Sequence, residues 1–171
     1  SVTVELSGKG EIHYTLNSAV PTVDDPVYTE PIRLDKTTVF RAVAVEDGAL
    51  PSRPLTLTYL INEDLTLPAV SVVTDELSRY NYIYYNNEKG IEVPGYVSFY
   101  EDGGGFSLGC GIKMNGSTSL DLFKKNLALR FRGCYGQEKL TYDLYGGGVT
   151  EFTNLVLRAG QDYYSAIIRT E

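Results

Sequence analysis

The feature that most constrains the fold is a series of short segments in which apolar and polar residues alternate. Residues 2–6, 12–16 and 55–61 show this period of two, and residues 37–45 resemble a central strand. Alternation places apolar side chains on one face of a strand. Turn-forming residues separate these segments: Pro21, Asp24, Asp25, Pro26, Gly48, Pro51 and Ser52. Closely spaced short strands predict an antiparallel β-sandwich of immunoglobulin or fibronectin type over residues 1–62.

The chain beyond Pro68 begins a new pattern, so residues 62–68 are expected to be a linker. Residues 67–76 are apolar on both faces, which indicates a buried strand. Further strand signals follow: a hairpin over residues 96–115 with its turn at 102–105, and strands at 125–132 and 153–160. Residues 75–90 are too rich in Tyr and Asn to assign. The final residues, 165–171, resemble the start of a helix. We therefore expect a second domain at 67–171, a truncated β-rich α+β lobe, in a mainly β protein.

Composition excludes several classes of partner. The chain of 171 residues has a net charge of −7 and no basic block, whereas nucleic acids and anionic membranes require clustered Lys and Arg. No apolar segment approaches the roughly 18 residues of a membrane helix. The chain starts directly in strand-like alternation, without a signal peptide. We interpret it as a piece of a longer protein whose targeting signal lies outside it.

The sequence does not favour a catalytic or metal-binding role for the single histidine, nor a disulfide between the two cysteines. His13 has the parity opposite to its apolar neighbours, so it is expected to be a solvated strand residue. A lone histidine also excludes a His-dependent triad or a zinc site within this chain. If the strands around Cys110 and Cys134 form a hairpin, the numbers of two facing residues have a constant sum. The apolar faces of the two strands match only when this sum is odd. For Cys110 facing Cys134 the sum is even, so we expect free thiols unless Gly133 forms a bulge.

Residues 111–118 nearly fit the phosphate-binding P-loop pattern, but Ser117 stands where that pattern has lysine. The residues that follow alternate as a strand instead of starting a helix, which excludes a Walker site. Lys125 shares its parity with the apolar residues of the next strand, and Lys124 points outward. Two interpretations of Lys125 remain: a phosphate-binding lysine, as in kinase-like folds, or a lysine whose stem covers the edge of the core.

Most of residues 1–62 resembles a known accessory module. The matching motifs are Gly10–Leu16, Pro21-Thr22, Tyr28–Ile32, Thr37–Val45, Pro51-Ser52 and Thr56–Tyr59. This pattern is similar to the fibronectin III-associated module, also known as the chitobiase/β-hexosaminidase C-terminal domain. At the first turn, residues 17–19 differ from the family's usual sequence. The resemblance implies a non-catalytic accessory β-sandwich in a secreted or cell-surface bacterial protein.

Residues 67–171 resemble the N-terminal part of the spore-coat CotH kinase family. That family has a Gly-x-x-Ser-Arg turn, a Lys-Lys-Ser segment and a later Leu-Arg-Asn-Gly segment. The residues that match are Gly116, Ser119, Lys124 and Lys125, and those that differ are Leu120, Asn126 and Ala159. The differences remove polar groups that could contact phosphate.

The resemblance implies that the parent is an atypical protein kinase with ATP and Mg²⁺ as cofactors. Its partners would be protein substrates or other cell-surface and spore-coat proteins. The expected cofactor-binding residues are Lys125, Lys124, Gly116, Ser117 and Ser119. No catalytic residue and no metal ligand is expected in the chain, which would be inactive alone. The alternative is a structural or adhesive extracellular module with a degenerate CotH-like region.

Overall fold

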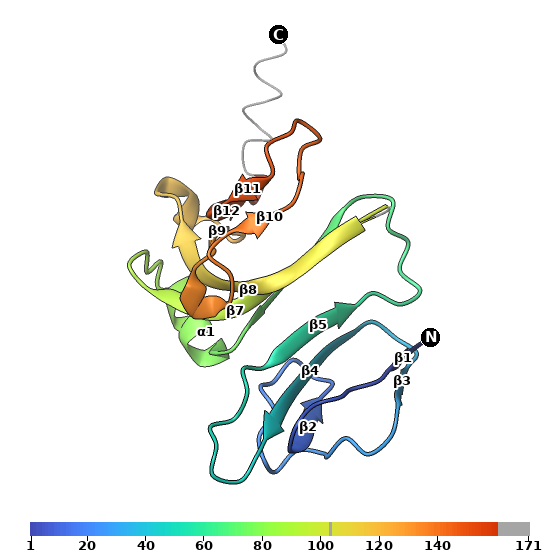
Figure 1. Ribbon diagram of the computed structural model, residues 1–171. Coiled ribbons are helices and arrows are strands. Elements are labelled where there is room, and N and C mark those ends of the chain that lie inside the picture. The colour runs from blue at the N-terminus through green and yellow to red at the C-terminus, as the bar shows by residue number, and fades with distance from the viewer. Residues whose placement is uncertain (103, 161–171) are drawn as a thin grey trace. The chain divides into compact units, whose positions relative to one another are not determined.

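The computed structural model describes residues 1–102 and 104–160, with Thr118 described by its backbone only (Figure 1). The described chain is mainly β, as its alternating pattern predicted. It divides into two compact units. Residues 1–73 and 98–107 form unit 1, and residues 74–97 with the described chain from 108 onward form unit 2. The predicted domain boundary between residues 62 and 67 stays a prediction.

Residues 1–59, within unit 1, contain five short strands arranged in two antiparallel sheets. They are β1 (Val2–Val4), β2 (Glu11–Thr15), β3 (Ile32–Leu34), β4 (Thr38–Val45) and β5 (Leu55–Tyr59). Strands β1 and β3 pair with each other, and β4 lies between β2 and β5 in the second sheet (Figure 1). This is the sandwich-like arrangement predicted from the sequence.

A compact apolar core joins the strands of unit 1. Phe40 at its centre is fully buried and stacks on Tyr14, with the ring centroids 6.0 Å apart. The other buried members are Val4, Leu34, Ala42 and Ile61. Phe40 and Ala42 lie two residues apart on β4, so the alternation of that strand supplies one wall of the core.

The remaining strands include a five-stranded sheet in the order β12-β9-β8-β7-β6. Its members are β6 (Ala69–Thr74), β7 (Glu92–Glu101), β8 (Gly104–Asn115), β9 (Asn126–Arg130) and β12 (Asn154–Leu157). A separate pair is formed by β10 (Leu140–Thr141) and β11 (Glu151–Phe152). The helical elements are α1 (Leu77–Tyr85) and the short 3-10 turns η1 (Thr118–Asp121) and η2 (Gly133–Tyr135).

In the register between β8 and β9, the numbers of facing residues have an odd sum, as predicted. Ile112 faces Leu129, so the apolar faces of the two strands coincide. Cys110 is buried and Cys134 is exposed, and neither thiol is in a disulfide. The hairpin expected over residues 96–115 is also present, as β7 and β8.

The prediction for residues 67–76 is right about a strand and wrong about its burial. Residues 67–76 were expected to form a buried strand, but β6 lies at the edge of its sheet and Val70 is largely exposed. An edge strand has one neighbour only, which leaves part of its apolar surface in water. Residues 75–90, left unassigned from the sequence, contain helix α1. The helix expected at residues 165–171 lies outside the described residues.

Candidate functional site

The turn after β8 contains three of the residues expected to bind a cofactor: Gly116, Ser117 and Ser119. Gly116 has a φ of +122°, and a Cβ atom there would lie 2.1 Å from the Ser119 hydroxyl oxygen. Only glycine fits this combination of backbone angle and close approach. The backbone N–H of Leu120 donates to the carbonyl oxygen of Ser117 at 3.0 Å, and the Asn126 amide lies 3.4 Å from the Ser119 hydroxyl. The turn is therefore closed by its own hydrogen bonds.

Lys125 extends from the start of β9 towards this turn. Its ammonium donates to the side-chain oxygen of Asn87 at 2.5 Å and to the carbonyl oxygen of Leu120. It also lies 5.5 Å from the centroid of the Tyr84 ring, which is within the range of a cation–π contact. Lys125 is half-buried and Lys124 is exposed, so the predicted orientation of the pair is confirmed. Their role in binding a phosphate stays a prediction.

A pocket of about 500 Å³ lies beside Lys125, between helix α1 and residues 121–125. The lining residues are Tyr80, Asn81, Tyr84, Tyr85, Asp121, Leu122, Phe123 and Lys125. The Tyr84 hydroxyl donates to the carbonyl oxygen of Phe123 at 3.0 Å, which ties the helix to the loop. Sequence reasoning did not identify this pocket. The spacing of Tyr80 and Tyr84, four residues apart and therefore on one face of a helix, was the available signal.

The aromatic side of the pocket is a chain of ring contacts along α1. The Tyr80 and Tyr84 centroids are 5.8 Å apart, and Tyr84 meets Tyr85 edge to face at 5.5 Å. Burial raises the pKa of Tyr80 above its usual value, and the neighbouring tyrosines add to the shift. Its hydroxyl is therefore a neutral hydrogen-bonding group near neutral pH.

The polar side of the pocket contains one carboxylate and amide groups. Asp121 Oδ1 accepts a hydrogen bond from the Asn87 side-chain amide at 3.3 Å. Within residues 1–102 and 104–160, no three His, Cys, Asp or Glu side chains are grouped to hold a metal ion. Asp121 is the one carboxylate among the residues that line the pocket, beside the aromatic rings of α1.

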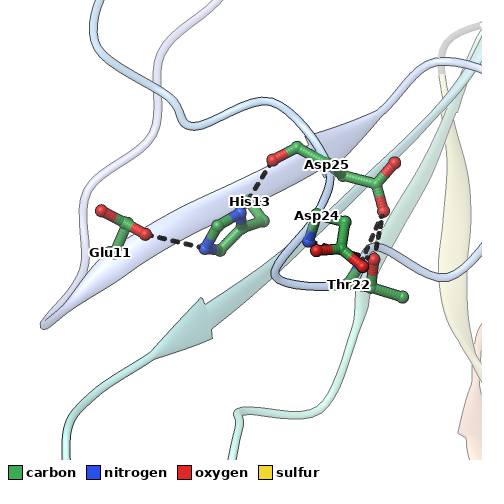
Figure 2. A network of polar contacts seen from close by, with 5 residues as sticks. All are labelled: Glu11, His13, Thr22, Asp24 and Asp25. Atoms are coloured by element: carbon green, nitrogen blue, oxygen red, sulfur yellow. Dashed lines mark hydrogen bonds and ion pairs between the residues drawn. The ribbon is translucent and has the colours of Figure 1, made fainter.

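The prediction that His13 is a solvated strand residue is wrong. Figure 2 shows its ring between Glu11 and Asp25, and only 3% of the residue is exposed. The ring Nε2 lies 3.0 Å from the Glu11 carboxylate, and Nδ1 lies 2.9 Å from the carbonyl oxygen of Asp25. The segment around Val27 pairs with the free edge of β2 through a bridge to His13, and the carbonyl oxygen of Asp25 in this segment contacts the His13 ring.

The loop that follows β2 is fixed by hydrogen bonds from two buried polar side chains, one on β2 and one on β4. Thr15 donates to the carbonyl oxygen of Ala19 at 2.6 Å, and Arg41 donates to that of Ser18 at 3.2 Å. The Asp25 carboxylate accepts the backbone N–H of Thr22 at 2.7 Å and its hydroxyl at 2.9 Å (Figure 2). These bonds lower the pKa of Asp25, with the backbone bond making the larger contribution. The His13 network therefore holds a loop in place.

A second carboxylate network lies in unit 2, around Glu92. Glu92 forms an ion pair with Arg132 at 3.1 Å and accepts the Tyr135 hydroxyl at 2.9 Å. Burial and this hydrogen bond raise the pKa of Tyr135 to about 12. A Cβ atom at Gly111 would lie 2.3 Å from the Glu92 carboxylate, so only glycine allows this close approach. The network secures the turn at residues 133–135.

Comparison with known proteins identifies the family resemblance of unit 1 only. Residues 2–59 match the family model described as Fn3 associated. No curated protein and no solved structure matches the chain. The matched segment contains the strands β1 to β5, so residues 2–59 are similar to the Fn3-associated family. No helix in the described residues is long and apolar enough to cross a membrane.

Proposed function

We propose that the chain is part of a secreted or cell-surface bacterial protein of the CotH family. Residues 1–62 would be its non-catalytic accessory domain, and residues 67–171 the N-terminal lobe of its kinase-like domain. The match of residues 2–59 to the Fn3-associated family supports the first half of this proposal. The Gly116–Ser119 turn and the Lys-Lys pair, carried on a sheet with one helix beside it, support the second.

The observation that carries the proposal is the position of Lys125. Protein kinases hold the phosphates of ATP with a strand lysine that is braced by a helix residue, usually a glutamate. Lys125 directly precedes strand β9, and the ring of Tyr84 and the side-chain oxygen of Asn87 contact its ammonium. Phosphate oxygens accept stronger hydrogen bonds than amide or carbonyl oxygens. A phosphate group can therefore replace Asn87 and the Leu120 carbonyl oxygen on the ammonium.

The same geometry supports a lobe without catalysis of its own. Phosphoryl transfer requires carboxylates that hold Mg²⁺ and a residue that orients the nucleophile. The described residues contain no group of three possible metal ligands. ATP and Mg²⁺ would thus be cofactors of the parent protein, whose remaining residues would complete the site.

A second candidate function is an adhesive extracellular module with a degenerate CotH-like region. The observation that favours it is the exposed aromatic surface beside Lys125, where Phe123 is 99% exposed. Large apolar side chains in water commonly mark binding surfaces. On this alternative, Lys125 only braces the pocket and contacts no phosphate.

Incubation with labelled ATP and Mg²⁺ or Mn²⁺ tests the absence of catalysis. We expect no autophosphorylation and no transfer to a generic protein substrate. Lys125→Ala is the informative variant, and Lys124→Ala is its matched control because the neighbouring lysine is exposed. Metal-dependent transfer that Lys125→Ala abolishes and Lys124→Ala preserves would refute the proposal that this chain is inactive alone.

A further inference from the structure

We propose that the pocket between α1 and residues 121–125 binds a neutral saccharide. The apolar face of a sugar ring would contact both Tyr85 and Phe123, and its hydroxyls would donate to Asp121 and Asn81. This proposal goes beyond the proposed function and does not depend on it, because it concerns the aromatic mouth of the pocket and not the turn at 116–119.

The first argument is the exposure of flat rings beside polar groups. Phe123 is 99% exposed and Tyr85 is 77% exposed, and both line the pocket. A purely apolar patch would suit a protein partner, but this one includes a carboxylate, a side-chain amide and phenol hydroxyls. Binding sites for small molecules combine apolar walls with a few polar groups in this way, in cavities of roughly 300–1,000 Å³. The pocket, at about 500 Å³, lies within that range.

The second argument is charge. The ammonium of Lys125 already contacts Asn87, the Leu120 carbonyl oxygen and the Tyr84 ring. Asp121 contributes one negative charge to the same lining and is exposed. The lining of the pocket therefore carries one positive and one negative charge, which sum to zero. A carboxylate only accepts hydrogen bonds, and its two oxygens offer about four lone-pair sites. Of these, Oδ1 accepts the Asn87 amide. A ligand with several O–H donors and no charge matches this lining best.

The third argument is preorganisation. The Tyr84 hydroxyl donates to the carbonyl oxygen of Phe123, which fixes the loop against α1 before any ligand binds. Tyr84 in turn supports Tyr85 through an edge-to-face contact at 77°. The loop backbone and the Tyr85 ring are thus held before binding, and groups that are already fixed lose little conformational entropy. Tyrosine and phenylalanine thus supply the stacking surface in a chain that contains no tryptophan.

The test is a titration of the isotope-labelled full chain, followed by backbone amide NMR, with cellotetraose and chitotetraose as probes. Both oligosaccharides present flat apolar ring faces with hydroxyls at the edges. We expect shifts confined to residues 80–85 and 121–125 at up to about 10 mM probe, an affinity typical of a small open site. Phe123→Ala and Tyr85→Ala should each weaken binding about tenfold. Tyr145→Ala should leave it unchanged, because Tyr145 is equally exposed but lies outside the pocket.

Asp121→Asn separates a neutral ligand from an anion. With a saccharide, this variant should weaken binding, and added salt should have little effect. If neither probe shifts the pocket residues, or if Phe123→Ala leaves the shifts intact, the proposal is wrong. Tighter, salt-sensitive binding of Mg·ATP at the same mouth in Asp121→Asn would also overturn it. Failure of the saccharide titration leaves the kinase-like proposal standing, because that proposal predicts shifts with Mg·ATP at residues 116–119 and 125.

Discussion

The thiol of Cys110 makes the folded chain sensitive to alkaline pH. Cys110 lies in β8 and is fully buried, and this burial, together with the Glu92 and Asp75 carboxylates, raises its pKa from 9.0 to about 12. In the unfolded chain the thiol loses its proton near pH 9.0, its ordinary value. Between these two pH values the folded state binds more protons than the unfolded state. The free energy of unfolding is therefore fully retained below pH 9 and falls as the pH rises towards 12.

The expected loss follows from the size of the shift. One pKa unit corresponds to about 1.36 kcal/mol, so the full shift amounts to about 4 kcal/mol by pH 12. At about pH 10.5, one and a half units above the unfolded pKa, the loss due to this thiol is about 2 kcal/mol. Cys110→Ala removes the titrating group. It costs about 1–2 kcal/mol at neutral pH through lost packing, but it should have a flatter stability profile above pH 9.

Urea unfolding followed by far-ultraviolet circular dichroism, under reducing conditions from about pH 8 to pH 10.5, measures this difference. Cys134→Ala is the matched control, since Cys134 is exposed and its loss should leave the profile of the wild type intact. Tyr135 also titrates at high pH, and the wild type and Cys110→Ala share its contribution, whereas Cys134→Ala removes a minor cause of its raised pKa. If Cys110→Ala lost stability with pH as steeply as the wild type, the argument from burial would be refuted.

Three further substitutions test the packing of the described chain. Phe40→Ala should lower the free energy of unfolding by about 3–5 kcal/mol in a denaturant titration, because the side chain is fully buried; a loss below 1 kcal/mol would contradict its central place in the core. His13→Ala should cost about 1–3 kcal/mol and speed hydrogen exchange at the Tyr28 amide, which bonds to β2; unchanged exchange would show that His13 does not hold the loop. Gly116→Ala should cost about 1–3 kcal/mol because of its positive φ and close contact, measured as a lower Tm, whereas Gly147→Ala, with open space around it, should be neutral; equal Tm values would disprove the steric argument.

The strand pattern of this chain could be predicted because alternation reports directly on which face of a strand is covered. The pairing of Ile112 with Leu129 follows from matching two apolar faces, and the outward direction of Lys124 follows from parity. Alternation fails where a loop contacts a side chain on the polar face of a strand. His13 has the parity of a solvated residue, yet it is buried and its ring contacts the carbonyl oxygen of Asp25 in the neighbouring loop. The alternation of residues along β2 does not predict this contact between the strand and the loop.

The pocket could be anticipated only in part. Lys125 was identified because its residue type and parity are visible in the sequence. Helix α1 could not be assigned, since its tyrosines and asparagines favour a helix only weakly. The approach of Tyr84 to Phe123 joins segments about forty residues apart, and it depends on how the helix packs after β6. Such long-range contacts are the part of a binding site that a single sequence leaves undetermined.

The most direct test of the account is a titration of the isotope-labelled chain with Mg·ATP, followed by backbone amide NMR. The central claim is that the turn at Gly116–Ser119 and Lys125 form the phosphate-binding part of a kinase-like lobe. We expect saturable shifts at the amides of residues 116–119 and 125, abolished in Lys125→Ala and retained in Lys124→Ala. Shifts that are absent from residues 116–125, or that persist unchanged in Lys125→Ala, would contradict the claim.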